Sequence, residues 1–239
     1  MAIFSKTLDY RDGEKTLEAF IAYDDAMTEK RPVILINHTW VGRDAFVAGK
    51  AQKIAELGYV GFAVDMYGKG VLGSNPQESA NLMQPFIDDR VMLQQRMEAA
   101  LAAAKQLPEV DAGKCAAIGF CFGGLCVLDL ARTGIDLKGV VSFHGLLGAP
   151  GNTYGEVITA KVLVLHGHDD PMAPVEQVIA FEQEMTQAQA DWQLHSYGNT
   201  MHAFTNPAAN DPKFGTVYKS VADRRSWQAM QNFLTELFS

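Results

Sequence analysis

The pattern of hydrophobic and polar positions changes once along the chain. The segments IFSKTLDY and TLEAFIAY alternate apolar and polar residues on either side of Asp12-Gly13, which is typical of an edge hairpin. From RPVILINH onward, continuous apolar strands alternate with segments of helical spacing. This alternation predicts an α/β fold, with a mostly parallel sheet covered by helices on both faces.

The expected elements continue to the end of the chain. The expected strands are RPVILINH, YVGFAVDM, KCAAIGF, KGVVSFHG, VLVLHG and WQLHSY, and the expected helices cover residues 44–57 and about 88–107, 123–132, 175–188 and 217–238. Residues 68–86 form the least regular part, which we expect to be a cap or one rim of a cleft. Because no linker rich in Pro, Gly or Ser divides the chain, we expect one domain over residues 1–239.

Composition and charge narrow the class of protein. The chain has 239 residues, 48% of them hydrophobic and 20% charged, which suits a globular domain with a sizeable core. The formal net charge is −8 and the Lys and Arg residues are scattered, so we expect no nucleic-acid partner. No apolar run reaches the length of about 18 residues that a membrane span needs. We therefore expect a soluble, cytoplasmic monomer or homodimer.

The three cysteines are expected to be free thiols. Cys115, Cys121 and Cys126 lie close together in the sequence without C-x-x-C spacing, which fits neither a disulfide framework nor a zinc site. No other motif points to a cofactor, and we expect neither cofactor nor metal.

The segment GFCFGG, at the junction of an expected strand and an expected helix, carries the strongest chemical signal. Gly119-Phe120-Cys121-Phe122-Gly123 has the spacing of the G-x-S-x-G nucleophile elbow with a thiol in place of the hydroxyl. The helix dipole there would favour a reactive thiolate, and the backbone N–H of Phe122 would face a developing oxyanion. Alternatively, the glycines serve only close strand-helix packing and Cys121 is a small buried hydrophobic residue.

Two downstream residues complete a candidate triad. Asp170 follows the strand VLVLHG, and His202 lies in a loop after the strand WQLHSY. The order nucleophile, acid, histidine is the order found in α/β-hydrolases. In this interpretation His202 activates the thiol, and Asp170 fixes the imidazole tautomer and stabilises the imidazolium.

Together, the motifs GFCFGG, HGHDDPMAP and MHAF resemble those of the dienelactone hydrolase family of α/β-hydrolases, over nearly the whole chain. The resemblance implies Cys121 as nucleophile, His202 as base and Asp170 as its partner. The loop NHTWVG matches the family's second oxyanion donor, which implies the backbone N–H of Trp40 beside that of Phe122.

The chain departs from the family pattern at positions that bind and sense the substrate. Family enzymes carry a glutamate in this loop that takes part in activating the cysteine, where this chain has Thr39. They also hold the substrate carboxylate with arginines, one of them four residues after the histidine, where this chain has Asn206. Because an unpartnered buried carboxylate is costly, we expect a neutral substrate. Without a competing glutamate, we also expect Cys121 to rest as a thiolate paired with the imidazolium of His202.

The expected pocket is apolar and uncharged. Its residues are Thr39, Trp40, Tyr67, Phe86, His144 and Phe204. We expect it to accept neutral esters and lactones, including bulky or aromatic ones; alternatively, about half of these aromatic residues are ordinary core. Some family members that lack the glutamate, including a metagenome-derived enzyme similar to this chain, are promiscuous phosphotriesterases, which implies neutral phosphotriesters as further substrates.

Two other functions remain open. His166, His168 and Asp170 form H-x-H-x-D, the start of a metallohydrolase ligand motif, although Pro171 follows where that motif has histidine. A hydrolase scaffold that has lost its activating glutamate could also serve as a binding protein without catalysis.

Overall fold

Eight strands follow one another in the order β1-β2-β4-β3-β5-β6-β7-β8 along a mostly parallel mixed sheet, which confirms the expected α/β class. The computed structural model describes residues 3–153, 155 and 157–239. Internal contacts divide the chain into two compact units, residues 1–118 (unit 1) and 119–239 (unit 2). One domain over residues 1–239 stays a prediction.

The elements lie close to those expected from the sequence. The strands are β1 Ile3–Asp12, β2 Lys15–Asp24, β3 Arg31–Asn37, β4 Val60–Ala63, β5 Val110–Phe120, β6 Gly139–Phe143, β7 Lys161–Gly167, β8 Trp192–Tyr197, β9 Asn210–Asp211 and β10 Thr216–Val217. The helices are α1 Ala45–Glu56, α2 Pro76–Asp88, α3 Arg90–Lys105, α4 Phe122–Arg132, α5 Val175–Gln187 and α6 Ser220–Phe238.

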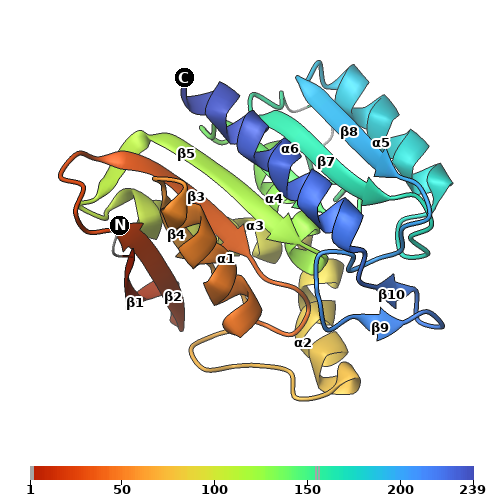
Figure 1. The fold of residues 1–239 in the computed structure, drawn as a ribbon, viewed down its shortest axis with the longest axis horizontal. Helices are drawn as coiled ribbons and strands as arrows, with labels where there is room; N and C mark the ends of the chain where they lie inside the picture. The colour runs from red at the N-terminus through yellow and green to blue at the C-terminus, as the bar shows by residue number, and fades with distance from the viewer. Residues whose placement is uncertain (1–2, 154, 156) are drawn as a thin grey trace. The chain divides into compact units, whose positions relative to one another are not determined.

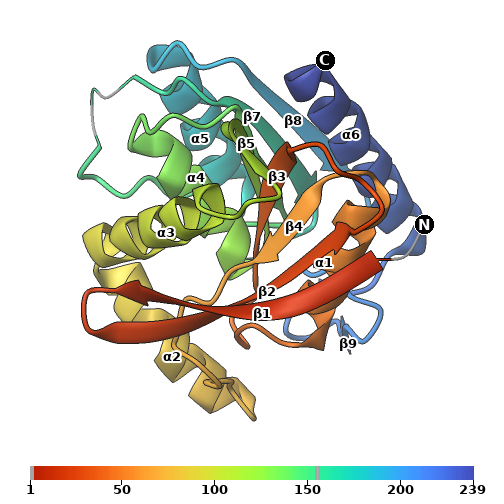
Figure 2. The same ribbon diagram turned by 90° about the vertical axis from the view of Figure 1, so that its left-hand side faces the viewer.

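Unit 1 begins with the expected edge hairpin. Strands β1 and β2 pair antiparallel from Ile3 opposite Asp24 to Asp12 opposite Lys15, and Gly13 has the positive φ of 54° that the tight turn requires. Strand β4 is buried at every position and pairs antiparallel with β2 and parallel with β3. Figure 2 shows α1 on one side of β3 and β4 and α3 on the other, so both faces of these strands are covered.

The segment 68–86 is more regular than the sequence analysis expected, because helix α2 covers Pro76–Asp88. Asn75 caps this helix by accepting a hydrogen bond from the N–H of Glu78 at 3.0 Å, and Pro76 occupies its first turn. Asn followed by Pro is a known start signal for a helix, but Pro85 interrupts the helical pattern and obscures it.

Unit 2 contains the parallel strands β6, β7 and β8. Helix α6 crosses in front of β7 in Figure 1, and α4 lies behind the strands. Helix α4 is buried along its whole length, and its residues pack mainly against β6. The strands of unit 2 therefore have helices on both faces.

The expected start of the last helix was wrong by a few residues. Helix α6 begins at Ser220, and the chain before it forms a short antiparallel hairpin in which Asn210–Asp211 pairs with Thr216–Val217. No helix within the described ranges is long and apolar enough to cross a membrane.

Close packing of α1 on β4 depends on Gly61. A Cβ atom at Gly61 would lie 2.9 Å from the Cα of Ala51 and closer still to its carbonyl oxygen. We expect Gly61→Ala to lower the free energy of unfolding by about 1–3 kcal/mol, because the helix must move away from the strand. The matched change Gly49→Ala, in the middle of α1 with no neighbour within 4 Å of the added Cβ, should instead raise it by about 0.5–1 kcal/mol. Urea unfolding of the two variants measures both, and a Gly61→Ala protein as stable as wild type would contradict the packing.

Candidate active site

Cys121 stands at a sharp turn between strand β5 and helix α4. Its backbone has φ 57° and ψ −118°, a conformation that L-residues adopt rarely and that strains the chain. The Cys121 N–H donates to the carbonyl of Phe143 at 3.0 Å, and the Cys121 carbonyl accepts from the N–H of Gly124 at 2.9 Å. The side chain is half-buried, whereas those of Cys115 and Cys126 are buried. The turn therefore presents this thiol, unlike the other two.

Two glycines allow this turn to form. A Cβ at Gly119 would overlap the carbonyl of Gly123 and lie 2.8 Å from the N of Gly124. A Cβ at Gly124 would lie 2.7 Å from the Cα of Gly145, beyond the end of β6. Close packing and presentation of the thiol are thus two effects of the same glycines, and the alternative of a buried, inert Cys121 does not fit its exposure.

Asp170 and His202 form the hydrogen-bonded pair that the sequence predicted. Both side chains are buried, and His202 Nδ1 lies 2.7 Å from Asp170 Oδ2. The other carboxylate oxygen of Asp170 accepts from the N–H of Met172 at 2.8 Å. Because a carboxylate only accepts, Nδ1 carries the proton and Nε2 is the ring nitrogen left for a thiol.

The Cys121 sulfur is close enough to act electrostatically on His202. Burial by itself disfavours the protonated ring, but the charge of the Cys121 sulfur and the hydrogen bond to Asp170 outweigh burial and raise the pKa of His202 to about 10. Nε2 of His202 has no hydrogen-bond partner of ordinary geometry among the described residues. A hydrogen-bond contribution from Cys121 nevertheless adds to the raised pKa of His202, so the two side chains lie in contact at a looser geometry than an ordinary hydrogen bond, as is common in active sites without substrate.

His144 and Phe204, two expected pocket residues, pack beside His202. The rings of His144 and His202 meet edge to face with centroids 5.1 Å apart, and Phe204 lies 5.1 Å from His144. His144 Nε2 is 2.8 Å from the hydroxyl of Thr205. Phe204 is fully buried and His144 nearly so. His144 therefore supports the ring of His202 from within the core, and Phe204 in turn supports His144.

The other expected pocket residues belong to unit 1, where three of them cluster. The Tyr67 hydroxyl donates to the carbonyl of Trp40 at 3.0 Å, and the Tyr67 and Phe86 rings lie 5.8 Å apart. Thr39 accepts a long 3.4 Å hydrogen bond from Val41 N–H. Phe122, the first residue of α4, belongs to unit 2 with the triad residues. An oxyanion site formed by the Phe122 and Trp40 N–H groups stays a prediction, as does a pocket that joins these residues.

The sequence profile of the dienelactone hydrolase family matches residues 17–238. The chain belongs to this family. Ester- and lactone-cleaving hydrolysis is its class of activity, as the resemblance implied.

Similar proteins include further members of the dienelactone hydrolase type. A crystal structure of a dienelactone hydrolase-like promiscuous phosphotriesterase from metagenomic libraries is 36% identical, covers 100% of both chains and superposes with a TM-score of 0.94. A candidate carboxymethylenebutenolidase of Yersinia pestis is 26% identical over 92% of this chain and 84% of its own. An uncharacterized protein of Caenorhabditis elegans is 41% identical over 62% of this chain and 95% of its own.

In this family member, the side chains of the H-x-H-x-D run do not converge in the way that metal ligands do. Asp170 is engaged by His202 and Met172, His166 is buried and His168 is exposed. Across the part of the chain that the structure describes, no three His, Cys, Asp or Glu side chains gather as a metal ion would require. Burial lowers the pKa of His166, which keeps this ring neutral near the triad.

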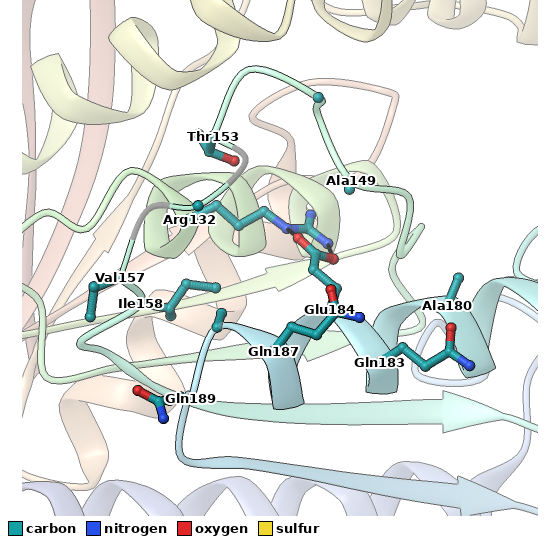
Figure 3. A pocket seen from close by; sticks show the side chains of 13 residues that line it. Arg132, Ala149, Thr153, Val157, Ile158, Ala180, Gln183, Glu184, Gln187 and Gln189 are labelled. Atoms are coloured by element: carbon teal, nitrogen blue, oxygen red, sulfur yellow. Dashed lines mark hydrogen bonds and ion pairs between the residues drawn. The ribbon is translucent and has the colours of Figure 1, made fainter.

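A pocket of about 550 Å³ lies elsewhere in unit 2 and contains none of the predicted site residues. Figure 3 shows it between α5 and the chain before β7. Arg132 and Glu184, which line it, form a two-point ion pair with N–O distances of 2.8 and 2.7 Å. Since this guanidinium is already neutralised, the described residues that line the pocket offer no free cation to a ligand.

Sequence reasoning missed the groups that hold His202. Thr205 has no motif that marks it as a partner of His144. The β9-β10 hairpin carries a turn signal, NDPKFG. The helical pattern after it led the expected helix to begin at about residue 217, inside the hairpin. Only tertiary contacts connect these residues to the triad.

The raised pKa of His202 predicts the pH dependence of thiol reactivity. Because His202 keeps its proton up to about pH 10, the ion pair with Cys121 that the sequence analysis expects would have its cation throughout pH 6 to 8. We expect the rate of alkylation by iodoacetamide to vary less than about threefold over this range, whereas a free thiol gains about tenfold per pH unit below its own pKa. His202→Ala should restore the steep slope, and the matched variant Cys126→Ala should leave the flat profile unchanged. A steep slope in wild type, or a thiol that resists alkylation in folded protein, would contradict the ion pair.

Proposed function

We propose that the chain is a cysteine hydrolase that cleaves neutral esters and lactones through a covalent enzyme intermediate. The observation that carries the proposal is the combination of a strained, half-buried Cys121 at the start of α4 with a His202 that is hydrogen-bonded to Asp170 at 2.7 Å. The influence of the Cys121 charge on the pKa of His202 supports their cooperation. Each residue type suits the role that the chemistry needs.

In the first half of the reaction the Cys121 thiolate attacks the carbonyl carbon. The carbonyl oxygen becomes an oxyanion, which the backbone N–H groups of Phe122 and Trp40 are proposed to stabilise. As the carbon-oxygen bond to the leaving group breaks, the His202 imidazolium gives its proton to the departing alkoxide. The products of this half are an alcohol and a thioester on Cys121.

In the second half, water attacks the thioester carbon. Neutral His202 takes a proton from the water through Nε2, while Asp170 holds Nδ1 and stabilises the new imidazolium. The carbon-sulfur bond then breaks, which releases the acid and restores the thiolate. A lactone follows the same steps, with both products joined in one hydroxy acid.

The proposed preference for neutral substrates rests on the two positions, 206 and 39, where the family resemblance implies charged groups and this chain has none. Four residues after His202, the side chain of Asn206 accepts a hydrogen bond from the N–H of Ala208 at 3.0 Å and holds a turn. An amide engaged in this way offers no charge to a substrate carboxylate. Thr39 likewise brings no charge to its loop, so an anionic lactone would lack a counter-ion from either position.

Neutral phosphotriesters are the second candidate substrates. The observation that favours them is the 36% identity, over the full length of both chains, to a promiscuous phosphotriesterase of the same family. The thiolate would attack phosphorus, an aryloxide would leave, and water would cleave the sulfur-phosphorus bond with His202 as base. The same residues serve both reactions.

Pre-steady-state hydrolysis of a neutral p-nitrophenyl ester and a neutral aryl phosphotriester tests the proposal. We expect a burst near one equivalent of p-nitrophenol with the ester, which Cys121→Ala abolishes and EDTA leaves unchanged. Steady turnover should fall at least about a thousandfold in Cys121→Ala, because the triad acts as a unit. Cys126→Ala, which removes a thiol from the same helix, should retain the burst.

Two other outcomes would replace the proposal. Activity that survives Cys121→Ala and disappears with EDTA would favour a metal site built on His166, His168 and Asp170. No turnover of either substrate would favour a binding protein on a hydrolase scaffold.

A further inference from the structure

The backbone of His202 is held by a segment far from the other triad residues in the sequence. The His202 N–H donates to the carbonyl of Gly215 at 2.9 Å, and the His202 carbonyl accepts from the N–H of Val217 at 3.1 Å. His202 and Thr216 thus form a parallel bridge. Both polar backbone groups of the proposed base are bonded to strand β10 and the residue before it.

The loop that carries His202 has little regular structure of its own. Asn199 and Ala203 have positive φ values of 53° and 57°, in a loop with no helix or long strand to fix its path. Further along, the N–H of Lys219 donates to the carbonyl of Phe204 at 3.1 Å. The chain leading into α6 therefore fixes the His202 loop at several points.

The same hairpin also contacts the loop of Asp170. Gly215 is buried with φ +81°, and a Cβ there would lie 2.7 Å from Cδ of Pro171, with Cγ closer still. Pro171 follows Asp170 directly, and the next N–H, that of Met172, donates to the Asp170 carboxylate. Gly215 therefore contacts the loop of Asp170 through its Cα, and its carbonyl accepts the hydrogen bond from the backbone N–H of His202.

We propose that the β9-β10 hairpin, residues 210–217, is a positioning element. Through Gly215 it holds the loops of Asp170 and His202 at fixed positions relative to each other. The inference rests on the proposed function of these residues as base and acid. Neither Gly215 nor any other hairpin residue is proposed to touch the substrate. Its effect is to fix the imidazole against the carboxylate and the thiol, where a displacement of about 1 Å can cost about a hundredfold in rate.

The exposed turn of the β9-β10 hairpin is a second place at which this element can be altered by mutation. Asp211 Oδ1 accepts from the N–H groups of Lys213 and Phe214, both at 3.1 Å. Asp211 and the turn residues are exposed, so changes there disturb the hairpin without opening the core.

The test is the burst and its pH dependence in Gly215→Ala. The added methyl group meets Pro171, so we expect the burst rate constant to fall about 10- to 100-fold with little change in KM. Since the hydrogen bond to Asp170 raises the pKa of His202, loosening it should also move the alkaline limb of kcat/KM to lower pH. A role in folding alone would not shift that limb.

Matched variants separate the clash from backbone strain. Gly58→Ala introduces the same kind of backbone strain, because Gly58 has φ +91°. Nothing lies within 4 Å of its added Cβ, so this variant should keep the wild-type burst and pH profile. Adding Pro171→Ala to Gly215→Ala removes the two ring atoms in the way and should restore most of the lost rate relative to Pro171→Ala alone.

The outcomes distinguish a failure of the proposed function from a failure of the positioning role of the hairpin. A wild-type protein without a Cys121-dependent burst defeats the proposed function, whatever the hairpin does. A normal wild-type burst with an unchanged rate and pH profile in folded Gly215→Ala overturns the positioning role. If Gly215→Ala does not fold, Asp211→Ala decides: we expect a loss of about two- to fivefold with the same downward shift of the alkaline limb, and a wild-type profile overturns the inference.

Discussion

The reversal of the chain at Cys121 is the constraint on which the candidate site depends. A residue held at φ 57° and ψ −118° costs on the order of 1–3 kcal/mol, and it persists only where the surroundings impose it. Here the following helix is buried along its whole length, and burial of one Leu or Phe contributes about 1.5–3 kcal/mol. Two or three side chains of α4 therefore offset the strain, and the fold maintains a thiol at a position that a relaxed turn would not give.

A second constraint concerns His202, which must meet a fixed thiol from a loop. The carboxylate of Asp170 orients one ring nitrogen, and the edge of His144 supports the ring. Hydrogen bonds to Gly215 and Val217 hold the backbone. Ring orientation, ring support and backbone position thus come from three different parts of unit 2. Precision in the proposed base is a property of the whole unit, because the loop that carries it has no regular structure to provide it.

Electrostatics explains how a thiol could be reactive without the family's glutamate. Burial opposes the charged form of His202, and the charges of Cys121 and Asp170 favour it more strongly. An imidazolium between two negative groups is stable at neutral pH, and a thiolate beside it is stabilised in turn. Thr39 adds no competing charge in this chain. The proposed preference for neutral over anionic substrates rests on the same absence of charge at positions 39 and 206.

Much of the fold follows from local patterns in the sequence, because strands such as Arg31–Asn37 are continuous apolar runs and α1 has clear helical spacing. The candidate triad was predictable from the glycines around Cys121 and from the chain order of Asp170 and His202, and the structure places these last two in hydrogen-bond contact. Helix α2 was missed because Pro85 disrupts its pattern. The bracing of His202 by Gly215 had no local signal at all, since a contact between loops depends on the complete fold.

The most direct test of the central claim is to identify the covalent intermediate itself. The enzyme would be quenched with acid within the first turnovers of a bulky neutral aryl ester and analysed by intact-mass and peptide mass spectrometry. The account predicts one acyl group per chain on the peptide that contains Cys121, with its amount rising and decaying together with the burst. Release of product while Cys121 remains unmodified, or an acyl group on another residue, would contradict it.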